Sequence, residues 1–317
     1  MVASMPPNIS KMTFSLPIAT DDYYLDISQV VSLCNRKFVR QGLNWVVSNI
    51  EIISDGDTRT TISKLPTSWV FANAWVKGFD KWREMRDQVL DDNPSIEAKY
   101  SDFKVYYDEF HEANGVANNL LPIGYSINHA LSDSYEWDMS ELSVPNDPAP
   151  GAVGTYHIHA LGASNPASKA LISGYALSRS RPQQVEPNAP AANSWMQQLF
   201  DVGDQLPEIR EDVVEENASP PYSVGIPTGV DSDEEFYPGG SNQANTWLSF
   251  IEDVLQTRAG TALGFDSSGT FIAPCGLLHF DVQLPNPEAL PSNIYLLLTL
   301  APGPVKGFLA QPMQEMN

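Results

Sequence analysis

The residues with the clearest chemical potential lie in the segment Arg36-Lys37-Phe38-Val39-Arg40. Positive side chains around aromatic residues contact the phosphates of nucleic acids, which supplies the sequence-independent part of such binding. Arg36, Lys37 and Arg40 are therefore predicted to face nucleic acid. The alternative is a turn or strand end whose bases pair with the many carboxylates of the protein.

Two other groups of side chains have a spacing that metals use. In a strand, His157 and His159 would point to one face about 7 Å apart, but no nearby cysteine or third ligand completes a site. The acidic run from Asp231 to Glu235 lacks the spacing and glycine of a calcium loop. We predict two strand histidines and a solvated acidic loop, with no metal site and no cofactor. A divalent cation bridging carboxylates between subunits stays open as an alternative.

Signatures of catalysis are missing from the sequence. It contains no GxGxxG, GxxxxGK[ST], GxSxG or HExxH motif. Carboxylates are so numerous that a pair at glycosidase spacing would arise by chance. The two cysteines, Cys34 and Cys275, form no metal-binding spacing and are predicted to be buried thiols. The chain is predicted not to be an enzyme, and no catalytic residue is assigned.

The elements that must position these residues are mostly strands. Segments rich in β-branched and aromatic residues recur between turn residues, which favours an antiparallel sandwich or barrel. The predicted strands are Thr13–Ile18, Tyr24–Leu33, Leu43–Ser54, Thr58–Ser63, Asp102–Phe110, Tyr135–Val144, Thr155–Leu161, Ala170–Ser178, Gly269–Leu284 and Ile294–Leu300.

One strong helix pattern runs from Thr67 to about Asp91, with Thr67 as its expected N-cap and Pro94 beyond its end. Its tryptophans follow helical spacing and are expected to pack the helix onto a sheet. Shorter helices are predicted near Ser194–Leu199 and over Asn245–Gln256, where apolar residues recur every three or four positions.

Charge is distributed unevenly along the 317 residues. The chain has 39 acids and 18 bases, a formal net charge of −21. Residues 201–240 contain eleven acids and one base, while eleven of the bases lie between residues 30 and 110. The proline-rich stretch 201–240 is interpreted as a long acidic excursion. The N-terminal residues lack a long apolar run, which predicts a protein made inside a cell without a signal peptide and without a membrane partner.

Several long segments resemble capsid proteins of circular, Rep-encoding single-stranded DNA viruses from environmental lineages. The resemblance covers nearly the whole chain. It is carried by NRKFVRQGLNWVVSNIEI (35–52), LPTSWVFANAWVKGFDKWREM (65–85), SDFKVYYDEFH (101–111), SGYALSRSRPQQVEPNAP (173–190), residues 194–205, YPGG (237–240), APCGLLHFDV (273–282) and LAPGPVKGFLAQPM (300–313).

This resemblance implies an all-β fold, a single jelly roll of two four-stranded antiparallel sheets with long loops and one inserted α-helix near 67–91. The predicted domains are a flexible segment over residues 1–12 and one capsid domain over 13–317, including the acidic excursion. The implied function is self-assembly of about 60 copies into a small icosahedral shell, located in the virion, around a single-stranded DNA genome. A host receptor would be a further partner.

The sequence departs from many such capsids in its charge. Residues 1–35 contain one base, Lys11, so a basic arm that neutralises the genome is not predicted. A shell this acidic repels DNA unless its charge is segregated. We therefore expect the bases of residues 30–110 to make the inner surface less negative, while residues 201–240 project outward. The alternative function is a secreted or surface β-sandwich that binds carbohydrate, although this would call for a secretion signal.

Overall fold

The chain forms two compact units. The computed structural model describes residues 8–95, 102–123, 137–145, 149, 151–179, 249–258, 263–287 and 290–315. Unit 1 combines residues 1–67, 100–140 and 249–317, and unit 2 combines residues 68–99 and 141–248. The chain leaves unit 1 twice to build unit 2. The single domain over residues 13–317 stays a prediction.

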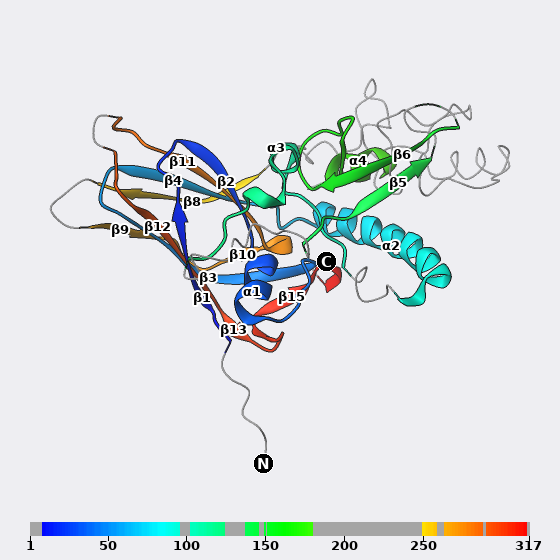
Figure 1. The fold of residues 1–317 in the computed structure, drawn as a ribbon, viewed down its shortest axis with the longest axis horizontal. Coiled ribbons are helices and arrows are strands. Elements are labelled where there is room, and N and C mark those ends of the chain that lie inside the picture. The colour runs from blue at the N-terminus through cyan, green and yellow to red at the C-terminus, as the bar shows by residue number, and fades with distance from the viewer. Residues whose placement is uncertain are drawn as a thin grey trace, which may run out of the picture. The chain divides into compact units, whose positions relative to one another are not determined.

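Unit 1 is an antiparallel β-sandwich (Figure 1). Its main strands are β1 (Lys11–Leu16), β2 (Asp21–Asp26), β3 (Leu43–Ser54), β4 (Thr58–Lys64), β8 (Phe250–Thr257), β9 (Gly264–Ser267), β10 (Phe271–Ala273), β11 (Leu277–Gln283) and β12 (Ile294–Leu300). Short strands follow at β13 (Pro302–Gly303), β14 (Gly307–Phe308) and β15 (Ala310–Pro312).

The strand order of the two sheets is that of a jelly roll. One sheet has the order β2-β11-β4-β8. In the other, β1, β12 and β3 are neighbours, and β9 and β10 both pair with β3. If β9 and β10 are counted as one interrupted strand, there are eight strands. Numbered along the chain, one sheet has the order first, eighth, third, sixth, and the other has the order second, seventh, fourth, fifth. Such a double-sheet arrangement of two Greek keys defines the jelly roll.

The sheet that contains β1, β12 and β3 has six strand segments rather than the four expected. Trp45 of β3 pairs with Ala273 of β10 on one side and with Ala310 of β15 on the other. Strand β15 therefore lies on the β12 side of β3 and extends the β12 line. The six segments occupy four lines, so the predicted two-sheet sandwich is confirmed.

Alternating side chains explain why these segments form a sandwich. In β1, Met12, Phe14 and Leu16 are buried, and in β12 every second residue from Ile294 to Leu300 is buried. A strand turns successive side chains to opposite faces, so this alternation places one face of each sheet against the core. Buried residues of both sheets form one hydrophobic cluster.

Helices interrupt unit 1 where the sequence predicts strands. The predicted strand Tyr24–Leu33 is wrong beyond Asp26, because α1 (Ile27–Asn35) begins there. The Asp26 carboxylate accepts hydrogen bonds from the Ser28 and Gln29 N–H groups and caps the helix. The predicted strand Asp102–Phe110 is also wrong, since it ends in α3 (Glu109–Asn114), which the 3₁₀ helix Val116–Asn118 follows.

One segment predicted as a helix is a strand. The predicted helix Asn245–Gln256 is wrong over its described part, because Phe250–Thr257 is strand β8 and pairs with β4 along its whole length. The apolar residues of this segment fit either period over a short window, so pairing with β4 decides the conformation.

Unit 2 contains a long helix and a small sheet. Helix α2 (Trp69–Asp92) is capped by the Ser68 side chain, one residue after the expected cap Thr67. Strand β6 (Val153–His159) pairs antiparallel with β5 (Glu141–Pro145) and parallel with β7 (Ser168–Ala170). Helix α4 (Leu171–Arg179), where a strand was predicted, packs against α2.

Several predictions fall wholly or partly outside the described residues. The acidic excursion 201–240 and the helix near Ser194–Leu199 lie there completely, and the predicted strand Tyr135–Val144 is described only from Trp137. Strand β1 begins at Lys11, inside the segment 1–12 predicted to be flexible. Among the described helices, none is both long enough and apolar enough to cross a membrane.

Candidate nucleic-acid interface

The predicted basic residues lie in the loop between α1 and β3, on unit 1. Helix α1 ends where Arg36 adopts the left-handed conformation, with φ 53°, and its N–H donates to the Ser32 carbonyl. Left-handed backbone ends many helices, although glycine is the usual residue there. This reversal ends the helix and starts an extended loop that carries Lys37, Phe38 and Arg40.

Two residues of the loop are fixed from below. Val39 is buried, and its N–H donates to the Ser32 hydroxyl at 2.9 Å. Gln41 is fully buried, and its side-chain amide both donates to the Val105 carbonyl and accepts from the Val105 N–H. Because alternate residues of an extended chain point in opposite directions, Phe38 and Arg40 point outward.

A fourth basic residue, from the far end of the chain, joins this loop. The Lys306 ammonium donates to the Phe38 carbonyl, and the Lys306 carbonyl accepts from the Asn8 side chain. Asn8 also accepts a hydrogen bond from the Lys37 ammonium at 2.7 Å. Lys37 and Lys306 are therefore held near each other by one neutral amide.

An aromatic pair flanks the same loop. The Phe38 ring is 45% exposed and lies 6.2 Å from the buried Trp137 ring. The Lys104 ammonium lies 4.8 Å from the centre of the Trp137 ring and 5.7 Å from that of Phe38. A cation at this distance from a ring face is attracted by the ring quadrupole. The buried Lys104 thus contacts both rings and helps to hold them in place.

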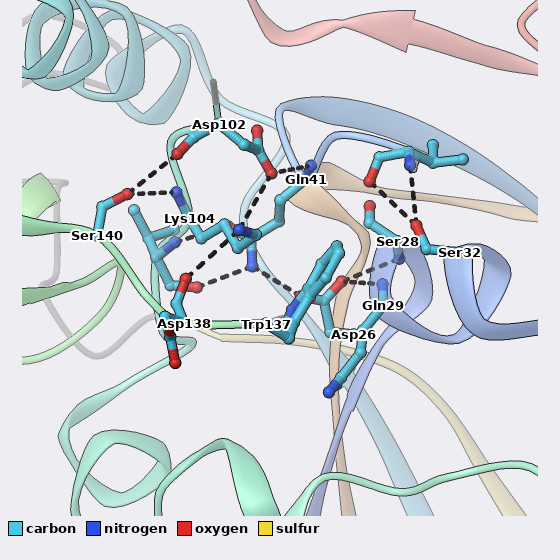
Figure 2. Close-up of polar contacts among 12 residues, drawn as sticks. Asp26, Ser28, Gln29, Ser32, Gln41, Asp102, Lys104, Trp137, Asp138 and Ser140 are labelled. Carbon is cyan, nitrogen blue, oxygen red and sulfur yellow. Dashed lines mark hydrogen bonds and ion pairs between the residues drawn. The ribbon is translucent and has the colours of Figure 1, made fainter. Parts of the chain in front are cut away.

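A buried carboxylate organises the floor of the loop, as Figure 2 shows. One oxygen of Asp26 caps α1, and the other accepts from the Gln41 side chain at 2.9 Å and from the Trp137 indole N–H at 3.0 Å. Burial raises the pKa of Asp26 to about 6, although all these hydrogen bonds favour its charged form. Asp26 thereby links the helix, the loop and the aromatic pair.

A second buried acid lies beside this network. Asp102 accepts from the Gln41 backbone N–H and lies 3.8 Å from the Lys104 ammonium. Burial raises the pKa of Asp102 to about 6, while the positive charges of Lys104 and Arg40 oppose the shift. The charge of Lys104 is thus answered by Asp102.

Unlike Lys104, three other bases of this region have no carboxylate within salt-bridge distance among the described residues. Within the described part of the chain, Lys37, Arg40 and Lys306 form no salt bridge with a carboxylate. The alternative, that these bases answer the protein's own acids, stays open, because the positive charge of Arg40 acts on Asp102. Cations in the same loop as an exposed ring form a surface able to bind phosphates and to stack on a base.

Sequence reasoning found three members of this cluster and missed the others. Arg36, Lys37 and Arg40 lie in one loop as their spacing requires. Lys306 and Trp137 were missed, because they are far from the loop in sequence and only the fold brings them to it. Gln41 was also missed; its position immediately after the basic segment carries no signal of its hydrogen bonds.

The two histidines considered as metal ligands, His157 and His159, lie in different surroundings. On β6, His157 is half-buried near Glu141, at 3.8 Å, whereas His159 is fully buried and lies 3.2 Å from the Ala163 carbonyl. Burial lowers the pKa of His159 to about 4, which keeps its ring neutral. Across the described ranges, no three His, Cys, Asp or Glu side chains are grouped to hold a metal ion.

Comparison with known proteins adds no assignment: no family model matches the chain, and neither the curated proteins nor the solved structures contain a significant match. The function is therefore argued from the jelly roll of unit 1, the loop surface and the resembling segments.

Proposed function

We propose that this chain is a coat protein whose copies assemble into a small icosahedral shell around a single-stranded DNA genome. The observation that carries the proposal is the jelly-roll strand order of unit 1. This architecture is used by viral capsid domains, and also by lectin domains and cupins. Because one fold hosts many functions, the proposal needs support from the surface as well.

Exposed apolar side chains on the edge strands support self-association. Within the described residues, β8 pairs with β4 alone and β9 with β3 alone, and the Gln256 N–H of β8 donates to the Asp266 side chain of β9 at 2.8 Å. Along these strands Ile251 is 65% exposed and Phe265 is 60% exposed. Large exposed apolar residues on an edge favour contact with another chain.

The basic loop supports the second half of the proposal. In a protein with a formal net charge of −21, Lys37 and Lys306 form no salt bridge with a carboxylate among the described residues, and Arg40 is exposed beside them in the chain. Local positive charge on one surface allows contact with a polyanion, since screening limits repulsion from distant acids to about 10 Å at 0.1 M salt.

The experiment is assembly of the purified full chain, followed by light scattering and electron microscopy. We expect closed particles of one diameter. A monodisperse monomer with the circular dichroism of a folded β protein, at every concentration and ionic strength tested, would contradict the proposal.

A variant on the edge strand sharpens the test. Phe265→Asp adds a charge at an exposed site, so the monomer should still fold. Assembly should be lost, or its critical concentration should rise by at least about tenfold. The control is Val153→Asp on β6, a site that is 70% exposed and lies in unit 2. Assembly of the Phe265→Asp chain at the wild-type concentration would exclude β9 from the subunit contacts.

A further inference from the structure

We infer that the loop 36–40 binds single-stranded nucleic acid by stacking a base on the Phe38 ring while neighbouring phosphates bind Lys37, Arg40 and Lys306. The inference rests on the proposed function and deepens it, because it assigns a binding mode to the basic loop and adds Phe38 and Lys306 to it. It concerns the isolated subunit as well as an assembled shell.

Phe38 has the properties of a stacking platform. A phenylalanine that is 45% exposed gains little from packing, yet its backbone is fixed by the buried residues Val39 and Gln41, which follow it in the chain, and through its carbonyl by Lys306. Trp137 and Lys104 lie against the ring at 6.2 and 5.7 Å. A ring held in place before binding loses little conformational freedom when a base stacks on it.

The cations around this ring are available to an anion. The Lys37 ammonium donates to the neutral side chain of Asn8, and Lys306 donates to a backbone carbonyl. By contrast, Lys64 is paired with Glu252 and Lys81 with Glu84. Phosphates can therefore bind Lys37 and Lys306 without first displacing a carboxylate.

The combination favours an unpaired strand over other polyanions. Bases in a duplex are stacked on each other and offer no free face to Phe38, whereas single strands offer one at each nucleotide. An acidic peptide would satisfy the cations but leave the ring unused. Loss of binding on removal of the ring alone is thus the distinguishing result.

The test measures binding of a fluorescent oligothymidylate of about ten nucleotides to the full chain by anisotropy. Phe38→Leu should weaken binding by about 5- to 100-fold and leave its salt dependence unchanged, because no phosphate contact is lost. Arg40→Gln and Lys306→Gln should each weaken binding and lower the slope of log affinity against log salt by about 0.7.

The control variant is Lys81→Gln on α2, which removes the same charge from a lysine paired with Glu84. The affinity of this variant for the oligothymidylate should stay within about twofold of that of the wild-type chain. Thermal unfolding of each variant checks that the loop substitutions leave the fold intact. Oligouridylate in place of oligothymidylate separates RNA from DNA as the bound strand.

Three results would overturn the inference: wild-type affinity in Phe38→Leu, equal affinity for a duplex of the same length, or equal affinity for polyglutamate. Its failure is distinguishable from failure of the proposed function. Particles that form without any oligonucleotide binding to the subunit would remove this site and leave the coat proposal standing. Binding by a chain that never assembles would do the reverse.

Discussion

At the level of single residues, Asp26 connects helix α1 to the basic loop and to Trp137. It is buried, yet its two oxygens accept four hydrogen bonds, from Ser28, Gln29, Gln41 and Trp137. Burial removes the hydration of this carboxylate, and the four hydrogen-bond donors replace part of it. Its raised pKa indicates that burial has a larger effect on the pKa than the donors have. The position of the basic loop therefore depends on an acid.

Asp26 and Asp102 make the free energy of unfolding depend on pH. Burial raises the pKa of Asp26 to about 6 and that of Asp102 to about 6, against about 3.9 for a free carboxyl. Between pH 4 and 6 the folded chain keeps protons that the unfolded chain has released. The contribution of these two groups to the free energy of unfolding therefore falls as pH rises through this window and is constant above about pH 7.

Asp26→Asn tests this sign. The fall in the free energy of unfolding between pH 4 and 7 should be smaller than in wild type by about 1–3 kcal/mol, because one of the two groups no longer titrates. Urea unfolding at a series of pH values gives both curves. Lost hydrogen bonds to Gln41 and Trp137 lower the whole curve but do not change its slope. Glu315→Gln, at an exposed site, should keep the wild-type slope; an unchanged slope in Asp26→Asn would contradict the assigned pKa.

At the level of elements, the turn between β10 and β11 joins the two sheets at the core. It passes through the 3₁₀ segment Pro274–Gly276, where Gly276 has φ 69°. A Cβ added there would lie 2.8 Å from the Trp45 ring. Trp45 is buried in β3, and its indole donates to the Ser28 hydroxyl of α1. Glycine at 276 thus lets the chain pass from one sheet to the other without moving the core.

Gly276→Ala should lower the free energy of unfolding by about 2–4 kcal/mol, from left-handed strain and from the collision with Trp45. Thermal unfolding followed by tryptophan fluorescence measures the loss. Gly269→Ala is the matched control, since a Cβ there meets nothing within 4 Å; its effect should stay within about 0.5 kcal/mol. Equal stability of the two variants would show that the turn adapts.

At the level of the whole molecule, the net charge of −21 opposes association of identical subunits. Apolar edge residues must then supply the attraction, and added salt should assist it by screening the repulsion. The Debye length falls from about 30 Å at 0.01 M to about 3 Å at 1 M.

We therefore expect assembly, followed by light scattering at pH 7.5, to begin at a lower protein concentration in 1 M than in 0.01 M NaCl. A chelator at constant ionic strength is the control that separates general screening from a bridging divalent cation. Particles that dissociate as salt rises would indicate contacts made by opposite charges and would contradict this account.

Local pattern alone was enough for several elements. The limits of β3 and β12 follow from alternation within Leu43–Ser54 and Ile294–Leu300, and both are as predicted. Helix α2 follows from its helical spacing and differs by two residues at its start. The start of α1 also had a signal, Asp26 followed by Gln29 at the spacing of a capping box, but the apolar run beyond it favoured a strand.

The sequence by itself determined that the chain forms a two-layer β fold, because an alternating strand can bury its apolar face only against a second layer. It also determined which bases would share one loop, because neighbours in sequence cannot be separated. Only the tertiary structure decided that β8 is a strand, that Lys306 and Trp137 meet Phe38, and that an inserted unit divides the chain. These depend on contacts between residues far apart in sequence, whose energies no local window contains.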